Sequence, residues 1–552
     1  MHTTNTLPLE TIQTPGKVAR LRLNQPRRVL ITALALGWSV DFFFYDKPLG
    51  ISLAIFVALL LAALLGLGWL EGKRPSPHNF WLVIPLIFFA VMVFMRANAF
   101  LTTLNVLAVL ALLSYLAFFY AAGRVDQLNV LGALLTPLRT GMHSLALSVP
   151  LLRESVDLQN AHAHGRRNLF PLLRGLLLAL PILLVLGSLL ASADLIFANY
   201  VEQALHLEFL ADVQAWIWRL CLMAGAAWLL AGGLVYALAW RETAVTDKSA
   251  LEELVEAVPR YLSLGFIESM VVLVLVNTLF LTFVSVQFAY LFGGKRQISL
   301  EGYTYAEYAR RGFFELVAVA VLTFALVMWL NWLTRRENKR QLRLFNWLGS
   351  GMVALVLVLL ASAWQRMRLY ELTFGYTELR LQVYVFMAWL AVALLWFLLT
   401  LWAQRRAYHV AIGLIISAIG FLVTLNALNP DALIARHNLH HYRETGELDA
   451  VYLSTLSDDA VPELLRALPQ VAGDAQLVAT SACHRDGAYS DAYAVEACEA
   501  TLPQILTANL NGRYQARLSD TSWQQWQSFH LSRQRAFADL AAWAGDDVTT
   551  KR

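Results

Sequence analysis

The sequence predicts an all-α polytopic membrane protein with about eleven transmembrane helices and a small, mainly helical C-terminal domain outside the cytoplasm. Three observations lead to this fold class. Of the 552 residues, 58% are hydrophobic and only 15% are charged, which is too apolar for a water-soluble domain. The apolar residues gather in runs near the roughly 20 residues that a helix needs to cross about 30 Å of hydrocarbon. Lys and Arg gather in the loops of one side.

The order of polar and apolar segments divides the chain into three parts. Residues 1–28 are polar and show no apolar core before a small-residue cleavage site, so we expect a cytoplasmic leader. Residues 29–428 form the predicted transmembrane bundle, and residues 429–552 the C-terminal domain. The expected spans are Val29–Phe44, Leu49–Leu70, Phe80–Met95, Leu104–Ala122, Leu172–Leu190, Val213–Trp240, Leu264–Phe292, Phe313–Trp332, Leu344–Ala363, Val383–Trp402 and Val410–Leu428.

Charge in the loops predicts the orientation, because Lys and Arg accumulate on the cytoplasmic side. With the N-terminus inside, basic groups such as Lys73, Arg74 and the run Arg335–Arg343 are cytoplasmic, whereas the opposite loop 193–212 has four acids and neither Lys nor Arg. Residues 128–152 are apolar enough for a further crossing, but this would bury Arg139 and His143. We therefore expect an interfacial or re-entrant helix there.

The C-terminal domain begins at the Asn429-Pro430 boundary, and an odd number of spans places it on the extracytoplasmic side. It holds 10 Lys and Arg against 16 Asp and Glu, so the basic excess lies in the membrane part, where cytoplasmic loops explain it better than nucleic-acid binding. Cys483 and Cys498 could pair in an oxidising compartment, which would contribute about 3 kcal/mol, or could remain two free thiols. Cys221 lies inside a span, where we expect it in the core.

Charged residues of both signs gather near the predicted outer ends of the spans. Two interpretations stay open: ion pairs that lock the helices together, or a polar cavity that binds a ligand. In the second, Arg310 would meet Asp41, Asp194 or an anion, since a guanidinium fits a carboxylate or phosphate. The residues of this outer-face polar cluster are Asp41, Arg96, Asp194, Arg310, Arg311, Glu315, Arg366 and Arg368.

Other polar groups give weaker signals. Glu268 and Asn277 lie within one span, where a proton relay or a hydrogen bond to a neighbouring helix would explain them. His437 and His441 are spaced i, i+4, as metal ligands can be, but no third ligand is evident. We therefore expect no metal and no cofactor.

Common catalytic motifs do not occur in the sequence. It contains no GxxxxGK[ST] phosphate loop, no HExxH, no GxSxG and no CxxC. The sequence thus gives no support for an ATP-driven enzyme, a zinc protease, an esterase or a thiol oxidoreductase. We lean towards a protein that is not an enzyme.

Four separated segments follow one another in a characteristic order: SADLIFA at 192–198, FAYLFGG at 288–294, TYAEYARRGFFEL at 304–316, and the stretch from Asn429 with its TGELD and DDAVP segments. Together they resemble a bacterial family of multi-pass membrane proteins known as domain of unknown function 4173, or its sibling 4153. The resemblance implies a bacterial inner-membrane location and no established activity. In that family the positions of His437, His440 and His441 are commonly Tyr, Glu and Arg, which weakens the metal hypothesis further.

Three classes of function fit these observations. The first is a non-enzymatic transport or envelope-signalling protein, in which membrane lipids surround the bundle and the C-terminal domain meets a protein partner. The second is a membrane-embedded transferase acting on lipid-linked sugars, with Asp41 or Asp46 in an outer cavity. The third is a structural subunit of a membrane complex, in which the outer charges only hold helices together.

Overall fold

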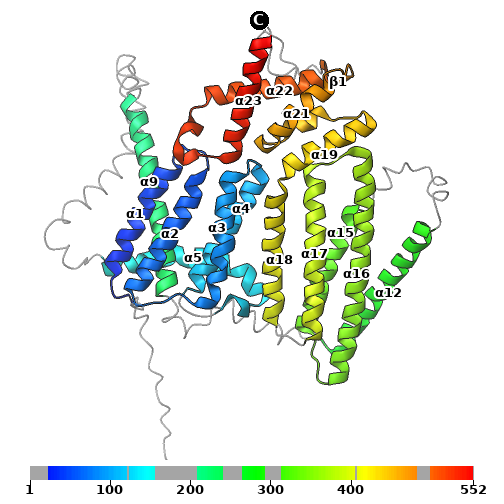
Figure 1. Ribbon diagram of the computed structural model, residues 1–552. Coiled ribbons are helices and arrows are strands. Elements are labelled where there is room, and N and C mark those ends of the chain that lie inside the picture. Colours follow the sequence, from blue (N-terminus) through cyan, green and yellow to red (C-terminus); the bar gives the residue numbers. More distant parts are fainter. Residues whose placement is uncertain are drawn as a thin grey trace, which may run out of the picture. The chain divides into compact units, whose positions relative to one another are not determined.

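The computed structural model describes residues 23–120, 124–155, 208–239, 264–292, 313–403, 407–480 and 498–550. These segments are almost entirely helical, as the composition predicts (Figure 1). The long helices up to residue 428 are α1 (Pro26–Phe44), α2 (Ile51–Leu70), α3 (Val83–Met95), α4 (Ala99–Phe118), α5 (Val130–Ser155), α9 (Glu208–Leu238), α12 (Phe266–Phe292), α15 (Phe313–Leu333), α16 (Lys339–Phe374), α17 (Glu378–Trp402) and α18 (Ala407–Leu428).

Nine helices in the described ranges are long and apolar enough to cross a membrane. They lie within 51–70, 77–95, 99–118, 215–238, 266–287, 313–333, 339–372, 378–402 and 409–428. Neither α1 nor α5 is among them, and the predicted span Leu172–Leu190 lies outside the described residues. The chain is thus a polytopic helical membrane protein.

Two of these helices differ from the predicted runs. Helix α16 has 36 residues and continues well beyond Ala363, so Arg366 and Arg368 lie in the helix rather than in a loop after it. Helix α4 begins at Ala99, five residues before the predicted Leu104, because Asn98 caps it by accepting a hydrogen bond from the Leu101 backbone N–H at 3.0 Å. Polar residues thus extend a helix that hydropathy alone would end.

By contacts, the chain divides into two compact units. The first holds residues 1–37, 66–74 and 141–248. In its described part, α9 packs closely on α5, since a Cβ at Gly232 would lie 1.6 Å from the carbonyl oxygen of Ser144. Cys221 of α9 is exposed, so the expectation that it lies in the core was wrong. In a span, an exposed side chain of this size faces lipid or another protein.

The second unit holds residues 38–65, 75–140 and 249–552. Its largest core is formed by α12, α15, α16 and α17, with Phe345, Met352 and Phe397 almost inaccessible to solvent. Two tryptophan side chains of α17 pack directly against two glycines of α18. A Cβ at Gly413 would lie 2.0 Å from the Trp396 ring, and one at Gly420 2.2 Å from Trp389. Only glycine leaves room for both indoles, so these positions determine how closely the two helices approach.

Two asparagine contacts inside this bundle join neighbouring helices through neutral amides. Asn105 of α4 and Asn426 of α18 are both inaccessible and exchange two side-chain hydrogen bonds, of 2.9 and 2.8 Å. Asn277 of α12 donates to the Leu348 carbonyl oxygen of α16 at 3.2 Å. An amide costs much less to bury in hydrocarbon than a charge, and these bonds reduce the cost further.

The C-terminal helices build a second core in the same unit. They are α19 (Pro430–Thr445), α20 (Ala450–Thr455), α21 (Val461–Val471), α22 (Leu502–Ser519) and α23 (Leu531–Thr550). A two-stranded antiparallel sheet, β1 (Leu477–Thr480) and β2 (Cys498–Thr501), accompanies them. Their core contains Ile434, Leu453 and Leu464. The chain turns from α18 into α19 at Asn429, which adopts a left-handed conformation (φ 52°) before Pro430.

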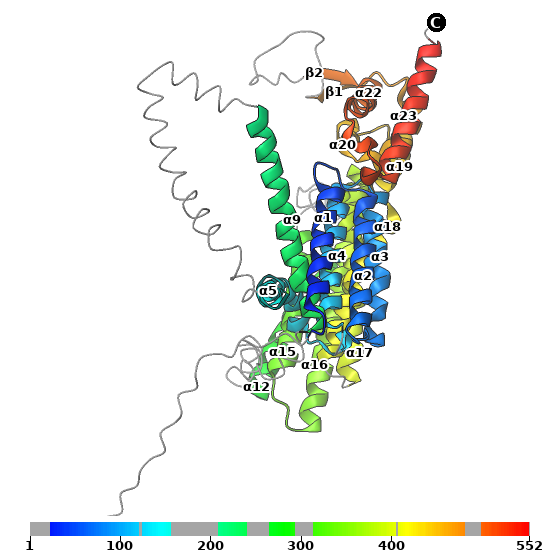
Figure 2. The same cartoon turned by 90° about the vertical axis from the view of Figure 1, so that its left-hand side faces the viewer.

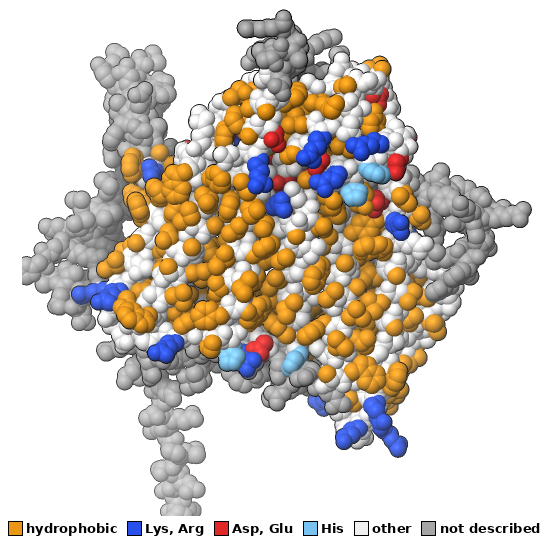
Figure 3. Space-filling model, in the orientation of Figure 1, with side chains coloured by type: hydrophobic (Ala, Val, Ile, Leu, Met, Phe, Trp, Pro, Cys, Tyr) orange, Lys and Arg blue, Asp and Glu red, His pale blue; other side chains and the backbone are white. Residues whose placement is uncertain are grey.

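In both ribbon views these helices lie at one end of the membrane helices of the second unit (Figures 1 and 2). The surface over α3, α17 and α18 is mainly hydrophobic, and charged side chains gather where these helices meet the C-terminal ones (Figure 3). That boundary is where ionisable side chains of the bundle and of the C-terminal helices can meet.

Candidate functional site

A three-residue turn, Arg96–Asn98, joins two membrane helices and forms the centre of the site. Arg96 ends α3 and Asn98 begins α4. The Arg96 Nε donates to the Asn426 carbonyl oxygen at 2.8 Å, near the end of α18. This short turn therefore lies against the end of the last membrane helix, where the chain passes into the C-terminal helices.

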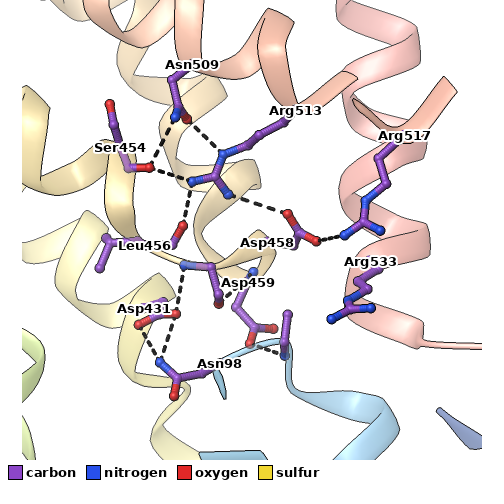
Figure 4. A network of polar contacts seen from close by, with 12 residues as sticks. Asn98, Asp431, Ser454, Leu456, Asp458, Asp459, Asn509, Arg513, Arg517 and Arg533 are labelled. Atoms are coloured by element: carbon purple, nitrogen blue, oxygen red, sulfur yellow. Dashed lines mark hydrogen bonds and ion pairs between the residues drawn. The ribbon is translucent and has the colours of Figure 1, made fainter. Parts of the chain in front are cut away.

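Two carboxylates from different helices share the side-chain amide of Asn98, and Figure 4 shows the bonds to one of them, Asp431. The Asn98 Nδ2 lies 2.6 Å from Glu378 Oε1, and 3.1 Å from both carboxylate oxygens of Asp431. Asp431 is 1% exposed and also accepts the Ser457 backbone N–H at 3.0 Å. Glu378 opens α17 and Asp431 opens α19, so one amide connects a membrane helix to a C-terminal helix.

A third carboxylate, Asp459, contacts the Arg96–Asn98 turn from the short 3-10 turn Asp458–Ala460. Its Oδ2 accepts the Ala97 backbone N–H at 2.7 Å, and its side chain is buried. Burial raises the pKa of Asp459, while hydrogen bonds from Ser532 and Ala97 and the charge of Arg96 act in the opposite direction. We refer to Glu378, Asp431 and Asp459 together as the junction carboxylates.

An ion cluster deeper in the C-terminal helices supports the segment that carries Asp459. The Asp458 carboxylate forms ion pairs with Arg513 at 3.4 Å and with Arg517 at 2.6 Å. Arg513 also donates to the carbonyl oxygens of Ser454 and Leu456. Two arginines of α22 thus hold the loop between α20 and α21, although one carboxylate balances only one of their charges.

His530, the residue before α23, also contacts the Arg96–Asn98 turn. Its Nδ1 accepts the Arg533 backbone N–H at 3.4 Å, and its Nε2 lies 3.2 Å from the Arg96 carbonyl oxygen. Burial, with the charge of Arg533, lowers the pKa of His530 to about 4. The ring is therefore neutral at pH 7, and with Nδ1 as acceptor its Nε2–H donates to Arg96.

Three carboxylates meet at this junction, and Glu378 and Asp431 share one amide as their hydrogen-bond donor. Like charges placed on one amide repel, so the contact is sensitive to the charge around it. A metal is a poorer fit: in the described ranges no group of three or more His, Cys, Asp or Glu has the arrangement of a metal site. His440 instead lies 3.5 Å from Glu444 on the exposed face of α19.

The outer-face polar cluster predicted from the sequence is distributed over several elements. Arg96 lies in the site, Asp41 is buried near the end of α1, and Glu315 is exposed in the first turn of α15. Arg366 is half-buried and Arg368 exposed in α16. Asp194, Arg310 and Arg311 lie outside the described residues, so a ligand site formed by the whole set stays a prediction.

The remaining predicted groups have local partners or fall outside the described ranges. Glu268 is exposed and caps its own helix by accepting the Gly265 backbone N–H at 2.9 Å. Asn277 makes the interhelical bond to α16 given above. Cys483 lies outside the described residues, as does the side chain of Cys498, so their pairing also stays a prediction.

Sequence reasoning did not single out Glu378, Asp431, Asp459 or His530 as site residues. The signal for two of them was present, since Asp431 follows Asn429-Pro430 and Asp459 belongs to DDAVP, both in segments that carried the family resemblance. Nothing in their spacing shows that α17, α19 and the α3–α4 turn converge.

The comparisons with known proteins give one match. Residues 83–467 match a family described as "Domain of unknown function (DUF4153)", which is one of the two siblings that the sequence motifs suggested. No curated protein matches the chain, and no solved structure does. The matched range contains the α3–α4 turn and all three junction carboxylates but ends before α22 and α23.

Proposed function

We propose a non-enzymatic role in transport or envelope signalling for this chain, which belongs to the DUF4153 family. In this role the junction carboxylates couple the membrane helices to the C-terminal helices. The observation that carries this proposal is the sharing of Asn98 by Glu378 and Asp431. A change in the charge of either acid alters the contact between α4, α17 and α19. The bundle and the C-terminal helices then respond to each other.

The same contacts favour this proposal over the two alternatives. The transferase alternative relies on Asp41, which is 4% exposed, or on Asp46, which is exposed. The junction acid Asp431 is 1% exposed and its carboxylate oxygens already accept hydrogen bonds, which suits a contact between helices better than a substrate site. A purely structural subunit would gain more from arginine partners than from three neighbouring acids, because repulsion between like charges opposes stability.

The proposed location is the bacterial inner membrane, with eleven spans, a cytoplasmic N-terminus and the C-terminal domain outside. Within the second unit, the charge distribution supports this orientation. Helix α16 begins at the end of the bundle away from the C-terminal helices (Figure 1). The basic residues at or just before this start are Arg335, Arg336, Lys339, Arg340 and Arg343. Basic residues on the side opposite the C-terminal domain are what the positive-inside rule requires.

Helix α5 fits the proposed interfacial position. Its apolar residues Leu134, Leu138, Met142 and Leu145 are exposed, whereas hydroxyl side chains at 136, 140, 144 and 148 are buried. Exposed leucines at this spacing form one stripe, which an amphipathic helix places against the acyl chains at the membrane surface.

A deletion strain tests the proposed function. It is complemented with wild type, with Asp431→Asn, or with Glu444→Gln, an exposed acid on the same helix, and its envelope lipids, glycans and exported solutes are compared. We expect altered solutes or envelope stress signalling with normal lipid-linked sugars, restored by wild type and E444Q but not by D431N. Loss of a lipid-linked sugar product would instead establish the transferase.

Reporter fusions at Arg552 test the orientation independently. We expect a reporter that is active only beyond the inner membrane to work there, and one that is active only in the cytoplasm to be silent. The reverse pattern, from stably expressed fusions, would overturn the proposed sidedness.

A further inference from the structure

A cavity of about 110 Å³ lies in the segment between α22 and α23, outside the range matched by the family. By this measure a cavity needs roughly 10–15 Å³ to hold one water molecule, so it has room for a group as large as phosphate. Two short 3-10 turns, Ser522–Gln524 and Trp526–Ser528, and the first turn of α23 form its walls. The side chains that characterise it are Trp523, Trp526, Ser528, Phe529, His530 and Arg533.

Arg533 is the charged residue of this cavity, since His530 is neutral at pH 7. Its side chain is half-buried, and in the described part of the chain its guanidinium has no hydrogen bond or ion pair; the buried Nε is unpartnered. The hydroxyl of Ser528, a residue that is 2% exposed, is also unpartnered. A half-buried guanidinium without an acceptor is costly, and an anion in the cavity would remove that cost.

The surrounding charges favour an anion. Asp458 already receives both Arg513 and Arg517, so it cannot neutralise Arg533 as well (Figure 4). Asp520, the other nearby acid, accepts hydrogen bonds from the backbone and hydroxyl of Ser522. Local positive charge therefore exceeds negative charge beside the cavity.

The cavity lies at the ends of membrane helices. The Ile51 backbone N–H, at the start of α2, donates to the Phe529 carbonyl oxygen at 2.9 Å. Gly50 fits so closely beneath this segment that a Cβ there would lie 2.6 Å from the Phe529 carbonyl oxygen. The cavity is thus at the depth where headgroups of membrane lipids lie.

An aromatic stripe leads from the cavity down α1. The Trp526 ring lies 6.1 Å from Phe42, and Phe42 is stacked on Trp38 at 5.8 Å. All three side chains are exposed: Trp526 by 52%, Phe42 by 37% and Trp38 by 60%. Acyl chains of a lipid could cover this stripe while its headgroup occupies the cavity, whereas a free phosphate would leave the stripe bare.

We propose that this cavity binds the phosphate of an anionic phospholipid, with Arg533 as its cationic ligand and the Trp526–Phe42–Trp38 stripe against the acyl chains. A guanidinium suits this role because it can donate two parallel hydrogen bonds to phosphate oxygens. The site holds the segment between α22 and α23 on the membrane surface.

Lipid binding to the purified full-length protein tests the proposal. Native mass spectrometry measures retention of phosphatidylglycerol and of phosphatidylcholine, and a thermal-shift assay measures the response to inorganic phosphate. We expect preferential retention of phosphatidylglycerol, a loss of at least about tenfold in Arg533→Gln and a smaller loss in Arg533→Lys. Arg535→Gln removes an equal but exposed charge from the same helix and should change retention by less than about twofold.

The possible results separate the sources of the phosphate. Equal retention by wild type and R533Q would overturn the proposal. Saturation of the site by inorganic phosphate, with no preference for the lipid, would overturn the lipid as its ligand. Because the Arg533 guanidinium has no hydrogen bond or ion pair to lose in the described residues, we expect R533Q to fold. Trp526→Ala should weaken lipid binding without changing the cavity charge.

Discussion

The interior of the membrane bundle and its junction with the C-terminal helices both bury polar groups, but of different chemistry. Inside the second unit's bundle these groups are amides and hydroxyls, such as Asn105 with Asn426, and Ser269 with Thr334. At the junction they are ionisable: the junction carboxylates, the Asp458 cluster and His530. Hydrocarbon penalises charge far more than a neutral amide, and Asp431 and Asp459 are buried where the C-terminal helices cover them. The ionisable groups through which the proposed coupling would act therefore lie at the junction.

The largest effect is expected at the ion cluster of the junction. The variant Asp458→Ala leaves Arg513 and Arg517 without their shared carboxylate. It should lower the free energy of unfolding by about 3 kcal/mol. Thermal and chemical unfolding in detergent measure this loss. The control is Asp126→Ala, which breaks an exposed ion pair with Arg124 and should cost less than about 1 kcal/mol. Equal losses of stability in the two variants would show that the buried ion cluster stabilises the protein no more than an exposed ion pair does.

His530 should make the junction sensitive to acid. Its pKa in the folded protein is about 4, below the ordinary value of 6.5, so between these values the unfolded chain binds a proton that the folded chain does not. Stability therefore falls as the pH is lowered from about 6.5 to about 4, by of the order of 2 kcal/mol. Unfolding measured across this range should show the loss in wild type and a flatter profile in His530→Gln.

Asp459 should act in the opposite direction. Its folded-state pKa is raised above the ordinary value of 3.8, so its stabilising contribution is complete below that value and is lost as the pH rises through the folded pKa. Asp459→Asn, which cannot ionise, should gain stability relative to wild type over the same rise. A stability difference that does not vary with pH would show that Asp459 does not titrate there.

The smallest effect is expected inside the bundle. Asn426→Leu removes both hydrogen bonds to Asn105 and should cost about 1 kcal/mol in an unfolding experiment in detergent. Replacing both residues by Leu should restore part of that loss, because no buried amide is then left without a partner. A loss from N426L as large as that from D458A would remove the distinction between the two regions.

Hydropathy predicted most of the described membrane helices because the period and length of an apolar run suffice for that purpose. It was less successful at their ends. Polar residues continue α16 to Phe374, and the side chain of Asn98 begins α4 earlier than the apolar run does. Arg96 was singled out correctly as a polar helix end, but its neighbours Asp431 and Asp459 come more than 330 positions later in the chain.

By itself the sequence determined that this chain is a polytopic helical membrane protein and a member of its family, since composition, run length and local motifs are properties of neighbouring residues. The tertiary structure alone decided that Asn98 joins Glu378 to Asp431, that two glycines of α18 receive two tryptophans of α17, and that Arg533 lacks an acceptor among the described residues. The reason is physical: burial and pairing depend on which distant segments converge, and a linear pattern of residue types does not specify that convergence.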